Sequence, residues 1–112
     1  MARKSLSDKK RKKKNDDVEK WSHKHDYPIT DIWNTNHVLA GIIVSRLWAF
    51  KDHDKHGLAP GCADMDEWNK IIQKMIDAFA LLKHIYAYTD EENRVIEEGL
   101  DLFRKYFRYL WD

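Results

Sequence analysis

A chain of 112 residues with 43% hydrophobic residues can bury one hydrophobic core, which excludes a multidomain protein. Its single cysteine, Cys62, excludes a scaffold held together by internal disulfides. The longest apolar stretch, residues 38–50, is interrupted by Ser45 and Arg46, and the first 30 residues contain no apolar signal segment. We therefore expect an intracellular protein without a membrane span.

The net charge of +1 hides a basic amino-terminal arm. Residues 1–20 hold nine Lys or Arg against four Asp or Glu, which leaves a net charge of about −4 for residues 21–112. We predict that residues 1–28 form a flexible, partly helical arm and that residues 29–112 form the folded domain. A solvating arm is one interpretation, and nucleic-acid binding through residues 1–20 is another. The second would use the basic run Lys9, Lys10, Arg11, Lys12, Lys13 and Lys14.

Three amphipathic segments follow the arm. The first is predicted over residues 30–51, beginning at Thr30, and its apolar face is broad enough to contact more than one neighbour. A Gly- and Pro-containing loop over residues 52–63 precedes a second helix over residues 65–87. A third helix is predicted over residues 90–111.

Capping boxes mark the starts of the second and third helices, because Asp64 and Glu67, and likewise Thr89 and Glu92, are spaced three residues apart. Only a few residues separate these two helices, so they should form an antiparallel hairpin. The predicted fold is therefore all-α, a three-helix up-down-up bundle. Its seams account for four aromatic residues as packing: Trp68, Phe79, Phe103 and Phe107.

Histidines supply two possible sites, each with a plainer interpretation. Zinc-ligand residue types occur in and before the loop, but their spacing matches no closed zinc site, so solvated histidines are favoured: His23, His25, His53, Asp54, His56 and Cys62. A phosphohydrolase of the His-Asp type would draw on His37, His53, Asp54 and Asp101. Against it, the His53-Asp54 pair falls in a loop.

Acidic residues of the third helix supply another possible site. Glu98 and Asp101 are spaced so that they could hold magnesium beside a nucleotide phosphate, as in the all-helical pyrophosphohydrolases. The plainer interpretation is a solvated acidic face, with Glu91 and Glu92 favoured at a helix amino terminus. We therefore predict no metal, no cofactor and no catalytic residues.

Aromatic residues exceed what the three seams can bury. Contiguous exposed aromatic side chains usually mark an interface or a ligand pocket. The candidates for such a surface are Trp33, Trp48, Tyr106, Tyr109 and Trp111. Three charged residues beside apolar faces are candidates for a ligand contact or, preferably, a buried ion pair: Arg46, Glu98 and Asp101.

Three segments resemble a family of small, uncharacterised bacteriophage proteins: WNTNHVLAGIIVSRLWAFK, MDEWNKIIQKMIDAF and IEEGLDLFRKYFRYLWD. The resemblance covers residues 33–112, with departures at His37, Ser45 and Trp48. It implies a phage or prophage origin and a location in the bacterial host cytoplasm or the virion. It implies no mechanism.

The leading hypothesis is a phage-encoded, non-enzymatic accessory protein that binds a host or virion protein and self-associates. One alternative is an oligomer that sequesters a nucleotide and so counteracts host defence. Another is a nucleic-acid accessory protein that uses residues 1–20. The last is a metal-dependent nucleotide hydrolase that uses Glu98 and Asp101.

Overall fold

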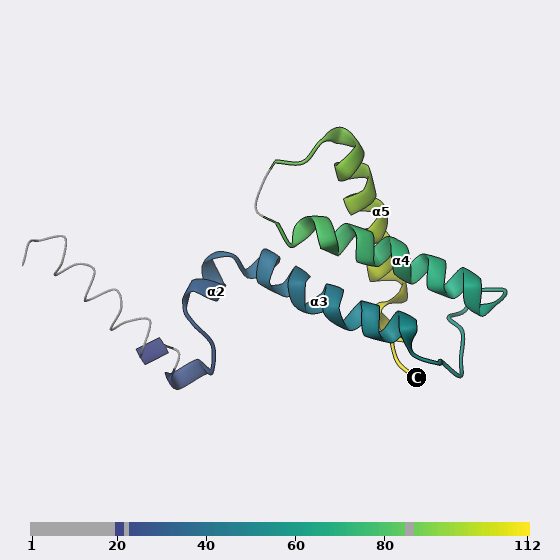
Figure 1. The fold of residues 1–112 in the computed structure, drawn as a ribbon, viewed down its shortest axis with the longest axis horizontal. Coiled ribbons are helices and arrows are strands. Elements are labelled where there is room, and N and C mark those ends of the chain that lie inside the picture. Colours follow the sequence, from purple (N-terminus) through teal and green to yellow (C-terminus); the bar gives the residue numbers. More distant parts are fainter. Residues whose placement is uncertain (1–19, 22, 85–86) are drawn as a thin grey trace, which may run out of the picture. The chain divides into compact units, whose positions relative to one another are not determined.

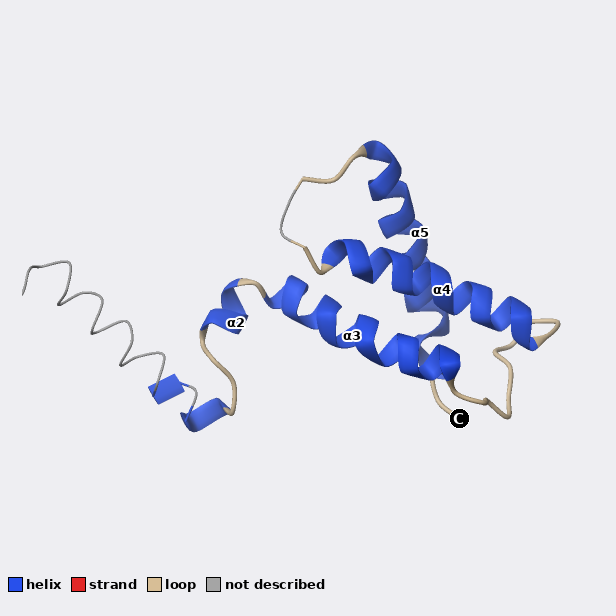
Figure 2. Cartoon of the chain, viewed as in Figure 1, coloured by secondary structure: helices blue, strands red, loops and turns tan. Residues whose placement is uncertain are grey.

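A computed structural model describes residues 20, 21, 23–84 and 87–112, and every regular element in these residues is a helix (Figure 2). The predicted all-α class is therefore confirmed. The chain divides into two compact units, Met1–Thr35 and Asn36–Asp112. Within the described part of the chain, no helix combines the length and the apolar character needed to cross a bilayer.

The amino-terminal unit contains an aromatic cluster and a short helix, α2, at Thr30–Trp33. Trp21 stacks on His25 with ring centroids 3.7 Å apart, and Tyr27 meets both rings edge-on. The Nδ1 atom of His25 lies 3.1 Å from the Trp21 carbonyl oxygen. This hydrogen bond between residues four apart holds the His25 ring over the Trp21 ring. The helix begins at Thr30, as its spacing predicts, and its cap residue Ile29 makes no side-chain hydrogen bond.

The first predicted helix, over residues 30–51, is interrupted. Asn34 leaves helical geometry with φ −128° and ψ 38°, and α3 begins immediately after it at Thr35–Asp52. Asparagine tolerates such a break because its side chain competes for backbone hydrogen bonds. The Thr35 hydroxyl donates to the Ile32 carbonyl at 2.6 Å, so a side chain satisfies part of the interrupted backbone.

The next two helices start where the capping pattern predicts, with α4 at Met65–Leu82 and α5 at Asp90–Tyr106. The box at α5 is complete, because Thr89 Oγ1 accepts from the Glu92 amide at 3.1 Å and Glu92 Oε1 accepts from the Thr89 amide at 2.9 Å. The box at α4 differs in one bond. Asp64 accepts from the Glu67 amide, whereas the Glu67 carboxylate accepts from the amide of Ala63.

Both helices end earlier than predicted, at Leu82 instead of residue 87 and at Tyr106 instead of residue 111. The carbonyl of Leu82 is satisfied by Nδ1 of His37 from α3 at 2.7 Å. After α5 the chain tightens into the 3-10 turn η1, Phe107–Tyr109. Because a 3-10 turn has three residues per turn, the side chains beyond Tyr106 leave the face that a 3.6-residue period assigns to them.

The core is centred on α4. Trp68 is 1% exposed and packs edge-to-face on Phe50 of α3, with ring centroids 6.3 Å apart. On its other side it contacts Tyr106 of α5, at a centroid distance of 5.5 Å. Three more large side chains of α4 are completely or almost completely buried: Ile72, Met75 and Ile76.

Backbones approach most closely where α5 crosses α4. A Cβ atom added to Gly99 would collide with the side chain of Ala78 and would lie 2.7 Å from the Lys74 carbonyl oxygen. By contrast, α3 runs antiparallel to α4 and reaches the core through its side chains (Figure 1). The helices thus differ in how tightly they pack, and the up-down-up bundle stays a prediction.

The substitution Gly99→Ala should lower the free energy of unfolding by about 1–3 kcal/mol, as overpacking usually does, despite the better helix propensity of alanine. Urea unfolding followed by circular dichroism measures this change. Gly41→Ala is the matched control, because its Cβ would meet only Lys83 Cγ at 3.9 Å. Equal stabilities of the two variants would contradict the close crossing.

Candidate functional site

The candidate metal ligands do not assemble into a metal site. Within residues 20, 21, 23–84 and 87–112, no group of three or more His, Cys, Asp or Glu side chains is arranged to hold a metal ion. Of the candidates for the His-Asp site, His37 donates from Nδ1 to the Leu82 carbonyl at the end of α4, and Asp101 is exposed on α5. Burial raises the pKa of the Cys62 thiol, which disfavours the thiolate that zinc requires.

The candidate ion pair among Arg46, Glu98 and Asp101 is not buried. All three residues are exposed, and the described part of the chain contains no buried charged residue. Glu98 instead pairs with Lys74 across α4 and α5 at 2.7 Å, with both side chains more than half exposed. Such surface pairs contribute about 0–1 kcal/mol, so this one is a weak link between the helices. The expectation of a buried pair is wrong.

The candidate aromatic residues fall in different environments. Tyr106 is only 7% exposed and belongs to the core, so it cannot form part of an exposed surface. Trp48 is partly exposed on α3, with the Lys51 ammonium 4.9 Å from its ring centroid. Trp33 is exposed on α2 in the amino-terminal unit.

Tyr109 and Trp111 line a hollow of about 320 Å³ with the loop residues His56–Leu58 and with Asp112. The Asp112 carboxylate holds this loop in place. It accepts from the His56 amide at 2.7 Å, from His56 Nδ1 at 3.1 Å and from His53 Nε2 at 3.0 Å. The loop histidines therefore tie the carboxy-terminal segment to the end of α3.

These bonds to His56, the backbone amide first and then the ring, lower the pKa of the Asp112 carboxyl to about 2. Partial desolvation opposes them, and the hydrogen bond from His53 adds to the lowering. A carboxylate that accepts several hydrogen bonds is stabilised in its charged form. The lining of the hollow thus combines a charged carboxylate, Asp112, with the aromatic side chains of Tyr109 and Trp111.

A second hollow, of about 310 Å³, lies between α3 and the end of α5. We refer to it as the apolar groove. One of its lining residues is charged, and the others are apolar: Ile43, Arg46, Leu47, Phe50, Phe103, Phe107 and Leu110. Two further apolar side chains of α3, Leu39 and Ile42, are about half exposed on that helix. Phe107 is 61% exposed at η1.

The seam pattern of the sequence predicts that Phe103 and Phe107 are both packed in the core. Phe107 follows Phe103 by four residues, which predicts a shared buried face, but α5 ends at Tyr106 and the 3-10 turn carries Phe107 into solvent. Leu39 lies on the broad apolar face of α3, where neighbouring Ala40 is buried instead. The breadth of that face is the sequence signal that part of it stays uncovered.

Comparisons with protein-family models, with curated proteins and with solved structures give no match to this chain. The basic run at Lys9–Lys14 lies outside the described residues. The structural observations that bear on function are therefore the apolar groove and the Asp112 hollow.

The Asp112 carboxyl should titrate at about 2 in the folded protein, against an ordinary value of 3.8. Because the folded pKa is the lower one, the carboxylate stabilises the fold above pH 3.8, and this contribution is lost as the pH falls through about 2. An NMR titration of the side-chain carboxyl carbon measures this pKa. His56→Ala should raise it only in part, since the backbone amide still donates, and His53→Ala should raise it less. A pKa near 3.8 for Asp112 in the wild-type protein would contradict its hydrogen bonds from His53 and His56.

Proposed function

We propose that this chain is a non-enzymatic protein-binding module that docks a host or virion protein in the apolar groove. In this proposal α3, α4 and α5 form a rigid three-helix, up-down-up scaffold of phage or prophage origin. The observation that supports it is the exposure of large apolar side chains around one hollow, above all Phe107 at 61%.

Exposed apolar residues scattered singly are ordinary, but contiguous ones generally indicate an interaction site. Leu39 and Ile42 share one side of α3, and Phe107 lies across the groove from that helix. Full burial of such a side chain contributes about 1.5–3 kcal/mol, and these three are roughly half exposed. Covering them would supply part of the free energy that association requires.

The hydrolase alternative has less support. Glu98 is engaged by Lys74, and both Glu98 and Asp101 are exposed on α5. Metal-assisted hydrolysis needs ligands held at fixed geometry in a site that limits water. A binding role makes no such demand on this surface.

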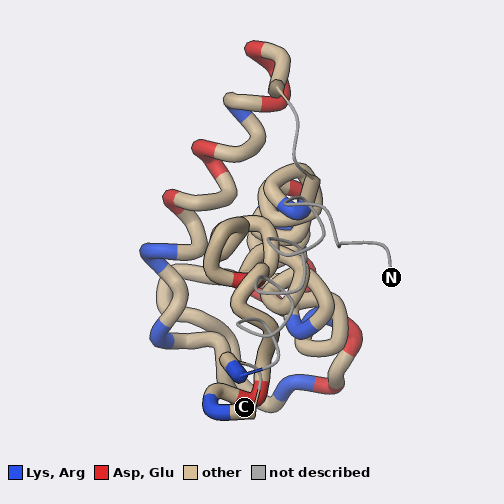
Figure 3. Tube along the Cα trace, turned by 90° about the vertical axis from the view of Figure 1, so that its left-hand side faces the viewer, with Lys and Arg blue, Asp and Glu red and all other residues tan. Residues whose placement is uncertain are grey.

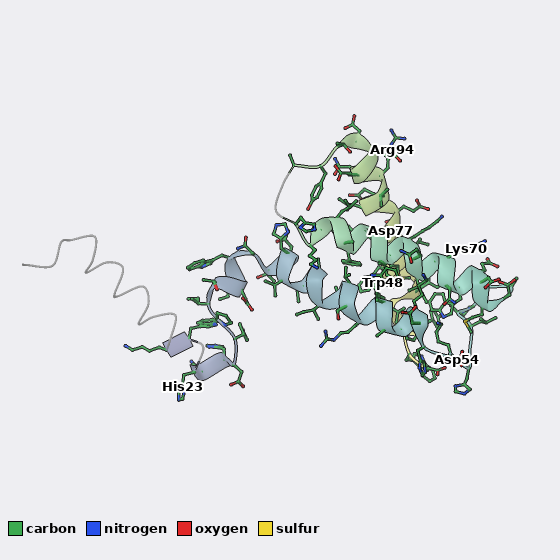
Figure 4. All side chains as sticks on the ribbon, in the orientation of Figure 1. His23, Trp48, Asp54, Lys70, Asp77 and Arg94 are labelled. Atoms are coloured by element: carbon green, nitrogen blue, oxygen red, sulfur yellow. The ribbon has the colours of Figure 1, made fainter. Side chains whose placement is uncertain are left out.

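A photoreactive benzoylphenylalanine at position 107 should crosslink the full chain to a larger protein in phage-infected or prophage-carrying bacteria. The matched control places the same group at Arg94, which lies near the start of α5, the helix that precedes Phe107, and pairs with Glu91 (Figure 4). Adducts at position 107 that disappear with Leu39→Ser would support docking in the groove. Adducts of equal yield at both positions, or none at either, would sink the proposal.

A further inference from the structure

We infer that the occupant of the apolar groove is an amphipathic α-helix of another protein that carries carboxylates beside its apolar side. This inference rests on the proposed function and adds the kind of partner. Three observations support it: the charge of the segments that contribute the groove walls, the exposure and weak hydrogen bonding of Arg46, and the shape and length of the apolar face of α3.

The two segments that contribute the groove walls are basic in an otherwise acidic unit. Residues 36–112 contain ten Lys or Arg against thirteen Asp or Glu. The segments 35–51 and 102–111, which include every lining residue of the groove, contain five Lys or Arg and no acid, and Arg46 is the one of these five that lines the groove. Figure 3 shows a similar separation along α5, whose acidic residues concentrate in its upper part, with Arg94 among them, and whose other basic residues lie at its lower end.

Arg46 is the only charged residue that lines the groove. It is exposed, and its guanidinium donates to the Ile42 carbonyl of its own helix at 3.4 Å, a long bond. Arg104 and Arg108 are exposed and follow Phe103 and Phe107 in the sequence, but they do not line the groove. Guanidinium groups bind carboxylates in pairs of parallel hydrogen bonds. Arg46 can therefore donate to a carboxylate of the partner, which would accept both bonds.

The groove suits a helix better than an extended peptide. Its walls are helix side chains, and the described residues contain no strand edge to pair with an incoming strand. An extended backbone laid on apolar side chains would leave its amides and carbonyls unpaired, whereas a helix satisfies its own. From Leu39 to Phe50 the surface runs about 17 Å at 1.5 Å per residue, which matches three turns of a helix.

A second copy of this chain fits the groove less well. Two copies packed groove to groove would bring their basic segments together. The acidic first half of α5 cannot serve as the guest helix, because its apolar residues Ile96 and Gly99 are buried. The exposed helix α2 has only four residues, too few for three turns.

The test uses a pair of fluorescein-labelled helical peptides of about 18 residues, each with leucines spaced three and four apart. One flanks the leucines with Glu and the other with Lys. Fluorescence anisotropy with the full chain should show the Glu peptide binding about tenfold tighter or more at low salt. Arg46→Glu should reverse this preference. Arg94→Glu, the matched control on α5, should leave it unchanged.

Loss of binding of both peptides in Phe107→Ala would place them in the groove, with Leu39→Ser as the second variant if Phe107→Ala fails to fold. Equal affinity for the two peptides, or an unchanged preference in Arg46→Glu, would overturn the inference. A dimer in sedimentation that dissociates in Phe107→Ala would also overturn it, since a second copy would then fill the groove. If position 107 crosslinks a partner but neither peptide binds, the acidic helix is wrong and the proposed function stands.

Discussion

The indole of Trp68 is the point at which α3, α4 and α5 meet, and the positions of the other two helices follow from it. Phe50 packs against one part of the ring and Tyr106 against another. Leu39 lies about three helical turns before Phe50 on the same side of α3, which places it beyond the reach of the Trp68 ring. Once Tyr106 is buried, the residues that follow it are the first that can leave the core. Phe50 of α3 and Phe107 after α5 both line the apolar groove, so the groove adjoins the packing around this tryptophan.

Helix starts were predictable from the sequence because they depend on local hydrogen bonds. Asp64 and Thr89 bond amides three residues away, and nothing distant is needed to form those bonds. Helix ends were not predictable in the same way. The end of α4 depends on His37, which is 45 residues distant in the chain, and periodicity carries no information about such a contact.

The binding surface was only partly predictable, for a similar reason. The sequence indicates that α3 has more apolar residues than one neighbour can cover, but Leu39 and Ala40 are equally plausible core residues until α4 is in place. At the end of α5 the roles of two adjacent aromatic residues are the reverse of those predicted. Tyr106 is buried and Phe107 is exposed, because the helix ends between them. Charge was the more readable signal, since the absence of acids from both walls is visible in the sequence.

At both ends of the connection between α4 and α5, side chains form hydrogen bonds with the backbone of the helix termini. His37 holds the Leu82 carbonyl, and Thr89 and Glu92 complete the first turn of α5 between themselves. At the end of α4 the amides of Lys83 and His84 also donate to the carbonyls of Phe79 and Leu81, at 2.9 and 3.2 Å, so an insertion that preserves both helices belongs after His84. A fluorescent tag or a small inserted domain could be carried there with both helices preserved. The chain thus offers an attachment point on a different connection from the one that Asp112 holds.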